Sequence, residues 1–338
     1  MGGDGNVSVV KITVLGAGYM GSAMATVARM CGHEVRLWGT WLDDPMLDPC
    51  ARGEAHPRLR VTLDGIALYR ARELETALRG AELVVHAVNS DGVVPVVSKA
   101  APYLPDVPIL SVTKGFLEGK TGKMDRIDVV ASETASRPLR FVHAGGPAKA
   151  IEIARGVLTL MQFAGPDAAI CARAFGAKHM RIGATDDVAG AEICSALKNA
   201  YATGLGLWDG FVGKDAHNAR AACFTQAIAE MRKLALAGGG RVETVHGAAG
   251  LGDLHVTAAG GRNRVFGERV GAGRPAADVA REMLARGELT EGYPAIASAW
   301  RFARERGVKE LPLLAAIHAI VWQGREVGPT LAALELDA

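Results

Sequence analysis

Residues 9–21 read VVKITVLGAGYMG, a β-branched run that stops at Gly16 and continues as the pattern Gly-x-Gly-x-x-Gly. The next residues, 22–31 (SAMATVARMC), have the apolar spacing of a helix and are followed by Gly32, a typical stop signal. Residues 34–38 (EVRLW) then predict a second strand. A strand, a glycine turn, a helix and a strand within about 30 residues form a βαβ unit, whose crossover makes the two strands parallel.

Each glycine of this turn stands where a side chain would interfere with a bound nucleotide or with packing. Gly16 allows the tight turn, Gly18 lets a pyrophosphate approach the backbone, and Gly21 lets the helix and the strand pack closely. The helix N-terminus then presents free N–H groups to the phosphates. The turn therefore predicts a dinucleotide site, and a glycine turn without a ligand is the alternative. The residues of this site are Gly16, Gly18, Tyr19, Met20 and Gly21.

The end of the second strand normally distinguishes NAD from NADP, because an acid there binds the ribose 2′-hydroxyl and a base accepts a 2′-phosphate. Here that stretch, residues 38–41, reads WGTW and has neither. The hydroxyl and N–H of Thr40 are able to donate to a 2′-phosphate, so we expect NADP or NAD as the cofactor, with NADPH accepted at least as well as NADH. The preference reverses if one of the two aspartates that follow folds back toward the ribose. The charged residues nearby in the sequence are Asp43, Asp44, Arg58 and Arg60.

Strands and helices continue to alternate through the first half of the chain. Buried strands are predicted at residues 83–88, 108–113 and 140–144, with helical stretches such as 73–79 and 93–104 between them. This pattern predicts an α/β, Rossmann-like domain with a doubly wound, mostly parallel sheet.

After about residue 187 the apolar positions recur at helical spacing, and no strand is predicted. The glycine run at 238–240 indicates the end of one helix before another begins. We therefore expect a dinucleotide-binding domain over residues 1–187 and an all-helical, substrate-binding domain over residues 188–338. The predicted helical stretches are 189–207, 216–237, 242–247, 276–286 and 295–305.

The composition indicates a folded globular protein whose net charge does not favour binding to a nucleic acid or an anionic membrane. The 338 residues suffice for about two domains, and 49% hydrophobic with 22% charged residues is ordinary globular usage. A net charge of +2 gives no overall field that attracts a nucleic acid or an anionic membrane. No run approaches the roughly 18 apolar residues of a membrane span. We expect neither nucleic-acid binding nor stable membrane insertion.

The cysteine pattern favours a reducing compartment. The five cysteines are widely spaced and form no CxxC or His-containing zinc pattern, so no metal site is expected. The first residues lack the basic and apolar regions of a signal peptide. We expect a cytoplasmic protein, and we expect it to be a homodimer.

Three segments of the second half are unusually polar for their setting. Lys198 and Asn199 lie on a predicted packed helix, where the lysine either extends to solvent or is kept in a cleft that lowers its pKa toward that of a usable base. Asp253 stands in the glycine-bounded GLGDL of 250–254, where a helix N-cap is the alternative role. Thr257 precedes GGRNR at 260–264, which suits a phosphate, and a basic surface loop is the alternative.

These motifs together resemble the NAD(P)-dependent glycerol-3-phosphate dehydrogenase family, over nearly the whole chain. The segment from Trp38 to Leu59, with WGT and HPRL, resembles archaeal-type members most. The shared pieces are GAGYMGSA at 16–23, SVTKGF at 111–116, Gly146-Pro147-Ala148, ALKN at 196–199, GLGDL at 250–254, Thr257 and Arg262-Asn263.

The resemblance implies hydride transfer between NAD(P) and C2 of glycerol 3-phosphate, with dihydroxyacetone phosphate as the ketone. Lys198 would be the general base or acid, Lys114 would help to hold one lysine neutral, and Asp253 would orient the lysine. The residues that would bind the substrate are Lys114, Asn199, Thr257, Arg262 and Asn263. Further residues that the resemblance places at the cofactor are Asn89, Ala148, Arg262 and Glu291.

Two other functions remain open. A β-hydroxyacid dehydrogenase or ketopantoate-reductase-like enzyme shares the glycine turn and a Lys-Asn helix but acts on a carboxylate, and the Thr257 to Asn263 segment disfavours it. A nucleotide-sensing Rossmann protein without catalysis is the alternative outside the enzymes, and the set of Lys114, Lys198 and Asp253 argues against it.

Overall fold

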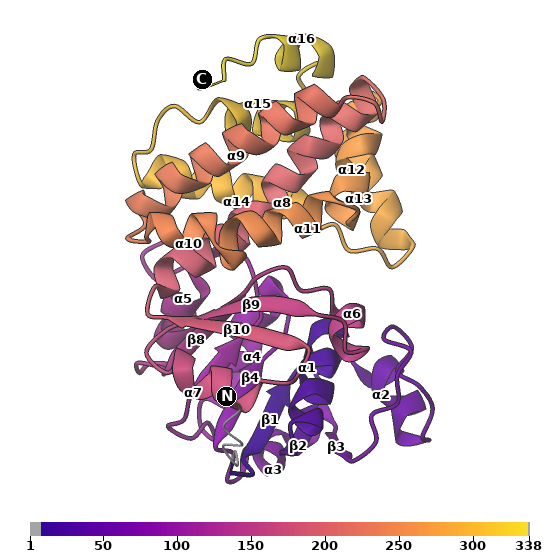
Figure 1. The fold of residues 1–338 in the computed structure, drawn as a ribbon, viewed down its shortest axis with the longest axis vertical. Helices are drawn as coiled ribbons and strands as arrows, with labels where there is room; N and C mark the ends of the chain where they lie inside the picture. Colours follow the sequence, from indigo (N-terminus) through magenta and orange to yellow (C-terminus); the bar gives the residue numbers. More distant parts are fainter. Residues whose placement is uncertain (1–7, 337–338) are drawn as a thin grey trace. The chain divides into compact units, whose positions relative to one another are not determined.

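The computed structural model describes residues 8–336, whose contacts divide the chain into two compact units. The first unit comprises the residues up to Thr113 together with Ile127–Val188. The second comprises Lys114–Arg126 together with the residues from Ala189 onward. Figure 1 draws the two units with colours that follow the sequence.

The first unit is built on one eight-stranded sheet in the order β10-β9-β8-β5-β4-β1-β2-β3. All neighbouring strands are parallel except β8 and β9, which pair antiparallel. The predicted α/β, mostly parallel sheet is therefore confirmed. The strands are β1 (Lys11–Leu15), β2 (Glu34–Trp38), β3 (Ile66–Tyr69), β4 (Leu83–His86), β5 (Ile109–Ser111), β8 (Phe141–Gly145), β9 (Thr159–Ala164) and β10 (Met180–Thr185).

Helices cover both faces of this sheet, as a doubly wound fold requires. One apolar cluster joins the sheet to α1, α6 and α7, and a second joins it to α3 and α4 on the opposite face. Side chains of adjacent residues, such as Val14 and Leu15, enter different clusters because successive residues of a strand point to opposite faces. The helices are α1 (Tyr19–Met30), α2 (Asp44–Ala51), α3 (Leu74–Leu78), α4 (Val93–Ala100), α5 (Ile127–Ala135), α6 (Ala150–Ala154) and α7 (Ala168–Ala174).

Three strands of the sheet, β3, β9 and β10, were not predicted. β3 and β10 are the two edges of the sheet, and β10 exposes Arg181, Gly183 and Ala184. β9, next to that edge, leaves Leu160 52% exposed. β9 and β10 lack the continuous apolar run by which the central strands were recognised, and the run of β3, IALY, is only four residues long.

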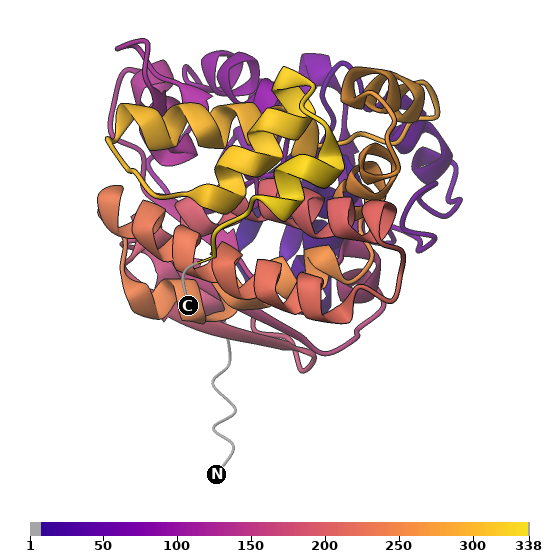
Figure 2. The same cartoon turned by 90° about the horizontal axis from the view of Figure 1, so that it is seen from above.

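The second unit is helical apart from one hairpin. Its longest helix, α8 (Val188–Phe211), is buried along most of its length and lies in a single large apolar cluster. Figure 2 shows the C-terminal helices of this unit in yellow. Among residues 8–336, no helix has both the length and the apolar content that a membrane crossing needs. The other helices are α9 (His217–Ala237), α10 (Val242–His246), α11 (Asp253–Ala258), α12 (Arg262–Gly271), α13 (Ala276–Ala285), α14 (Gly292–Glu305), α15 (Pro312–Gln323) and α16 (Val327–Ala332).

Four glycines let α8 and α12 approach each other to backbone contact. A Cβ on Gly206 or Gly210 of α8 would overlap with the carbonyl oxygens of Arg264 and Glu268 on α12. On the other helix, a Cβ on Gly267 or Gly271 would overlap with carbonyl oxygens of α8. Both pairs have a spacing of four residues, which places the two glycines on one face of a helix. This crossing fixes the start of α12 close to the middle of α8.

The hairpin of the second unit comes from a segment that the prediction assigned to the first domain. β6 (Leu117–Glu118) pairs antiparallel with β7 (Met124–Asp125). Phe116 and Met124 belong to the core of the helical unit, and the ring of Phe116 stacks on Phe302 at a centroid distance of 4.2 Å. The predicted domains, 1–187 and 188–338, each consist of one continuous segment and so place this hairpin in the first domain. Helical periodicity does not indicate that a short segment between two strands leaves one unit and packs in the other.

Candidate functional site: a glycine turn and a lysine cluster

The glycine-rich turn lies between β1 and α1. A Cβ on Gly16, whose φ is +111°, would lie 2.6 Å from the carbonyl oxygen of Ala87, and one on Gly21 would overlap with the carbonyl oxygen of Gly16. In contrast, a Cβ on Gly18 would meet nothing within 4 Å, and no side chain caps α1, whose N-cap is Gly18. The turn thus presents bare backbone and a helix N-terminus to open space, which fits the pyrophosphate of a dinucleotide.

Asp43 folds back and connects this turn to the end of β2. Its Oδ2 accepts hydrogen bonds from the N–H of Thr40 (2.8 Å), from the Thr40 hydroxyl (2.8 Å) and from the N–H of Ala17 (3.2 Å). The expectation that the two Thr40 donors are free for a 2′-phosphate is therefore wrong, because Asp43 occupies both. An aspartate that folds back in this way is the condition under which the sequence analysis reverses the preference for NADPH over NADH.

Other residues predicted for the cofactor follow the carboxyl ends of parallel strands. Asn89 follows β4, and its Oδ1 accepts a hydrogen bond from the N–H of Gly92 (3.0 Å). Ala148 lies half-buried between β8 and α6. Tyr19 and Met20 begin α1, half-buried against the core of the first unit. Because the carboxyl ends of β1, β4 and β8 share one edge of the sheet, these residues gather where doubly wound sheets bind their ligands.

The second unit holds a cluster of two lysines on one carboxylate. Lys114 Nζ lies 2.6 Å from Asp253 Oδ2, and Lys198 Nζ donates to Asp253 Oδ1. The Asp253 side chain is 1% exposed, and those of Lys198 and Lys114 are 11% and 13% exposed. Asp253 begins α11 but does not cap it, since its carboxylate is engaged by the lysines. The sequence left two roles open for Lys198, and the structure buries it in this cluster.

The two lysines of the cluster differ in pKa. Burial lowers the pKa of Lys198 to about 8, an effect that the charge of Lys114 increases and that of Asp253 opposes. Burial also acts on Lys114, but the negative charges of Asp253 and Glu291 outweigh it and raise the Lys114 pKa. The two ammonium groups keep the pKa of Asp253 below its usual value despite burial. Lys198 is therefore the member that can exchange a proton near neutral pH, while Lys114 stays charged.

Asn199, the residue after Lys198 on α8, belongs to a series of hydrogen bonds made by side-chain amides. Asn199 donates to Glu291 Oε2 (3.1 Å) and accepts from Asn263 Nδ2 (2.9 Å). Asn263 in turn accepts from the N–H of Gly292 (2.8 Å). Asn199 and Asn263 are buried, and each hydrogen bond fixes which end of the amide is oxygen. The structure thus brings together three residues that the sequence placed far apart.

Arg262 and Thr257, predicted to hold the substrate, are arranged differently from each other. Arg262 is the first residue of α12, is exposed, and its guanidinium has no hydrogen-bond partner among residues 8–336. The preceding N-cap, Gly261, leaves the helix N-terminus without a side-chain cap. The Thr257 hydroxyl donates to the Asp253 carbonyl oxygen (2.7 Å), so its proton is already used. Arg262 is the better placed of the two to receive an anion.

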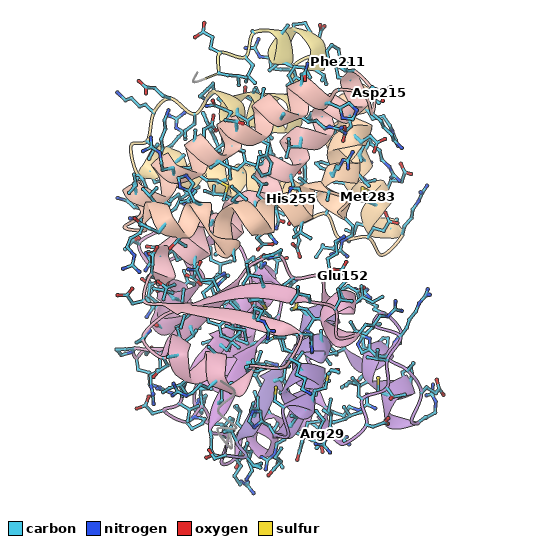
Figure 3. The ribbon with its side chains drawn as sticks, in the orientation of Figure 1. Arg29, Glu152, Phe211, Asp215, His255 and Met283 are labelled. Carbon is cyan, nitrogen blue, oxygen red and sulfur yellow. The ribbon has the colours of Figure 1, made fainter. Side chains whose placement is uncertain are left out.

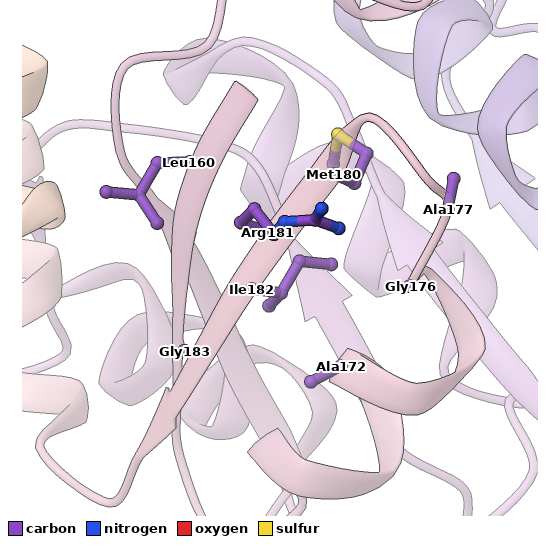
Figure 4. A pocket seen from close by; sticks show the side chains of 8 residues that line it. All are labelled: Leu160, Ala172, Gly176, Ala177, Met180, Arg181, Ile182 and Gly183. Carbon is purple, nitrogen blue, oxygen red and sulfur yellow. The ribbon is translucent and has the colours of Figure 1, made fainter. Parts of the chain in front are cut away.

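Two further features, one in each unit, carry no assignment. His255, labelled on α11 in Figure 3, is exposed and packs edge-on against Phe224 at a centroid distance of 6.2 Å. A hollow among β9, β10 and α7 is shown in Figure 4, with Arg181 and otherwise uncharged residues as its lining. That hollow contains none of the predicted site residues.

The contacts around the turn also involve a residue that the sequence analysis did not assign. His56 is fully buried, and its Nε2 lies 3.3 Å from the carbonyl oxygen of Ala17. These residues are 39 positions apart, and no periodicity or spacing rule joins them. Only the HPRL segment of the resemblance draws attention to this loop.

Two family models match the chain. The model described as NAD-dependent glycerol-3-phosphate dehydrogenase N-terminus matches residues 11–171, and the corresponding C-terminus model matches residues 187–332. An NADP(+)-dependent glycerol-3-phosphate dehydrogenase from Archaeoglobus fulgidus is 34% identical, covering 95% of this chain and 97% of that protein. A glycerol-3-phosphate dehydrogenase [NAD(P)+] from Thiobacillus denitrificans is 37% identical, covering 93% and 94%. The crystal structure of the Coxiella burnetii glycerol-3-phosphate dehydrogenase is similar with a TM-score of 0.84 at 27% identity, covering 96% and 98%.

Proposed function

This chain belongs to the NAD-dependent glycerol-3-phosphate dehydrogenase family, and from this premise we propose that its lysine cluster transfers the proton in that reaction. The enzyme interconverts glycerol 3-phosphate and dihydroxyacetone phosphate with NADP or NAD as the cofactor. Membership in this family removes the two alternatives, a dehydrogenase of hydroxy acids and a nucleotide sensor without catalysis.

The first unit holds the dinucleotide at the glycine turn. Gly18 leaves room for the pyrophosphate, and the N-terminus of α1 faces it. Asn89 and Ala148, which follow the carboxyl ends of β4 and β8, would contact the nicotinamide ribose. When bound, the nicotinamide supplies or accepts the electron pair and hydrogen that interconvert alcohol and ketone.

In the second unit, Lys198 donates a proton to the oxygen at C2 during reduction and removes it during oxidation. A pKa of about 8 suits both directions, because either form of the amine is accessible near neutral pH. Lys114 keeps its charge and stabilises negative charge that develops on the same oxygen. Asp253 holds both ammonium groups in place through its two carboxylate oxygens.

The substrate phosphate binds to Arg262 at the start of α12. Its guanidinium has no competing partner among residues 8–336, and the uncapped helix N-terminus adds a favourable partial charge. Asn199 and Asn263 keep their second amide protons for the glycerol hydroxyls, and Glu291 fixes Asn199 from the other side. Thr257 contributes only after its hydroxyl turns away from the Asp253 carbonyl.

The observation that carries this proposal is the buried contact of two lysines with one aspartate. The test is oxidation of NADH or NADPH by the purified protein upon addition of dihydroxyacetone phosphate, compared with unphosphorylated dihydroxyacetone and with ketopantoate. We expect turnover of the phosphorylated ketone and little turnover of the other two. Equal rates with the phosphorylated and unphosphorylated ketones would remove the phosphate site from the proposal.

We further propose that the protein acts as a cytoplasmic homodimer. All five cysteines are free thiols, which is typical of a reducing compartment. Phe211 and Val212, at the end of α8, leave large apolar side chains 47% and 58% exposed, which supports a covering partner. Sedimentation velocity at micromolar concentration tests this, and a single species of 35.3 kDa contradicts it.

A further inference from the structure

The end of helix α14 packs against the hairpin that follows Lys114. Arg301, Phe302 and Glu305 of this helix all contact residues of the segment 114–126. Arg301 and Glu305 are four positions apart, so their side chains leave the helix on the same face. These contacts join two parts of the second unit that are far apart in the sequence, since Glu118 and Arg301 are separated by 183 positions.

Arg301 and Glu305 together contact both strands of the hairpin and the turn between them. The Arg301 guanidinium donates to Glu118 Oε2 of β6 (2.5 Å) and to the carbonyl oxygen of Gly122. It also donates to Glu305 Oε1 (2.7 Å), and the second oxygen of Glu305 accepts from the N–H of Met124 on β7 (2.6 Å). The pair therefore fixes the hairpin at three places, although the Arg301 side chain is 42% exposed.

A ring contact continues this attachment toward Lys114. Phe116, two residues after Lys114, is buried and stacks on Phe302 with an interplanar angle of 10°. The one residue between, Gly115, has a φ of +140°, a conformation that residues with a Cβ rarely adopt. The backbone is therefore anchored to α14 within two residues of Lys114.

The position of Lys114 matters because its ammonium group shares one carboxylate with Lys198. Lys114 Nζ lies 2.6 Å from Asp253 Oδ2, and Glu291 adds a second negative charge that acts on it. The charged groups that act on Lys198 are Asp253, which raises its pKa, and Lys114, which lowers it. A displaced Lys114 would leave Asp253 to act on Lys198 with less opposition, so the Lys198 pKa would rise.

We propose that Arg301 and Glu305 are positioning residues, which hold the hairpin so that the ammonium group of Lys114 stays on Asp253. A lysine carries its charge on a flexible stem, and burial of that charge is costly, so the short contact depends on a fixed backbone. Arg301 and Glu305 act through Lys114 and not on the substrate. This inference rests on the proposed role of the lysine cluster in proton transfer.

The test follows the pH dependence of kcat/KM for dihydroxyacetone phosphate in Arg301→Gln. We expect kcat/KM below the inflection to fall by roughly three- to thirtyfold, because a small displacement at an active site costs up to about 10²-fold. The inflection should move to higher pH, by less than in Lys114→Met. The Tm should stay within about 3 °C, since partly exposed ion pairs contribute little to stability.

Two variants separate the position of the hairpin from the charge of Arg301. Arg286→Gln removes, at the end of α13, an arginine that likewise pairs with a glutamate four residues away (Glu282, 2.7 Å). It should leave kcat/KM within about twofold and the inflection in place. Arg301→Lys keeps the positive charge beside Glu118 and Glu305, and both quantities should lie between those of Arg301→Gln and the wild type.

The sharpest comparison places Arg301→Gln in the Lys114→Met protein. Without Lys114 there is no ammonium group to position, so the second substitution should change neither the inflection nor kcat/KM further. Equal effects of Arg301→Gln with and without Lys114 would overturn the inference, because they would show a general loosening of the helical unit.

Two further outcomes distinguish this inference from the proposed function. If Lys114→Met moves the inflection but Arg301→Gln leaves the pH profile unchanged, the positioning role is refuted and the proposed function stands. If the inflection stays in place in Lys114→Met itself, the role of the lysine cluster fails, and the inference fails with it.

Discussion

The glycine turn and the lysine cluster are built from opposite kinds of groups. The turn has no side chain at Gly18, so that backbone N–H groups face open space. The cluster consists of buried charged side chains, with two ammonium groups on one carboxylate. A change at the turn should therefore alter affinity for the nucleotide, whereas a change at the cluster should alter the rate of the chemical step.

The largest effect is expected for Lys198→Ala. Loss of a positioned acid or base lowers kcat by about 10²–10⁴-fold. The Kd of NADH or NADPH should be nearly unchanged, because the cofactor binds to the first unit. Steady-state kinetics and fluorescence titration measure the two quantities, and a variant that keeps a tenth of the wild-type kcat would refute the role of Lys198.

The second-largest effect is expected for Arg262→Ala. Removing a guanidinium from a phosphate should lower kcat/KM for dihydroxyacetone phosphate by roughly 30- to 1000-fold. Arg264→Ala is not a suitable control, since Arg264 already pairs with the buried Asp209 (2.6 Å) and its loss would disturb the fold. Arg274→Ala, which removes a partly exposed arginine of the same unit, is the matched control and should leave kcat/KM within twofold. Equal losses in both variants would show a non-specific charge effect.

Gly18→Val tests the glycine turn, where we expect an effect on cofactor affinity and not on the chemical step. Its backbone (φ −72°, ψ −170°) is open to any residue, and no atom of the protein lies within 4 Å of the added Cβ. The Tm should therefore stay within about 2 °C, while the Kd of the cofactor rises by roughly tenfold or more because the isopropyl group occupies the space of the pyrophosphate. Unchanged cofactor affinity in a folded Gly18→Val protein would mean that the dinucleotide does not pass over this glycine.

A smaller effect, on stability, is expected at the crossing of α8 and α12. Gly267→Ala places a methyl group against the carbonyl oxygen of Thr203 and should lower the free energy of unfolding by about 1–3 kcal/mol. Gly260→Ala, whose Cβ meets nothing within 4 Å, is the control for stability. Denaturant unfolding compares them, and equal midpoints would contradict the close approach of the helices.

The two regions also differ in how far the sequence predicts them. The glycine turn is local: strand, turn, helix and second strand follow one another within residues 9–38, so their order predicts both the fold and the ligand. The individual residues of the lysine cluster were found by their polar character on apolar segments. The contact between these residues could not be derived from the sequence pattern, since Lys114 and Asp253 are separated by 139 positions and come together only through tertiary packing.

The errors of prediction have the same origin. Thr40 was expected to be free because the sequence does not decide whether Asp43 folds back, whereas in the structure one carboxylate oxygen of Asp43 accepts from three donors of Thr40 and Ala17. Strand β10 was missed because exposed residues break up its apolar pattern, and β3 was missed because its apolar run, IALY, is only four residues long. The hairpin of β6 and β7 was assigned to the wrong unit because the contacts of Phe116 are made with residues far along the chain.

The pH dependence of reduction tests the central claim most directly. Because reduction needs protonated Lys198, kcat/KM for dihydroxyacetone phosphate should be constant below the pKa of about 8 and fall as the pH rises through it. Lys114→Met removes the neighbouring positive charge, which should move this inflection to higher pH, since Asp253 then acts on Lys198 alone. An inflection that stays at the same pH in Lys114→Met, or that persists in the residual activity of Lys198→Ala, would contradict the assignment of Lys198 as the proton-transfer group.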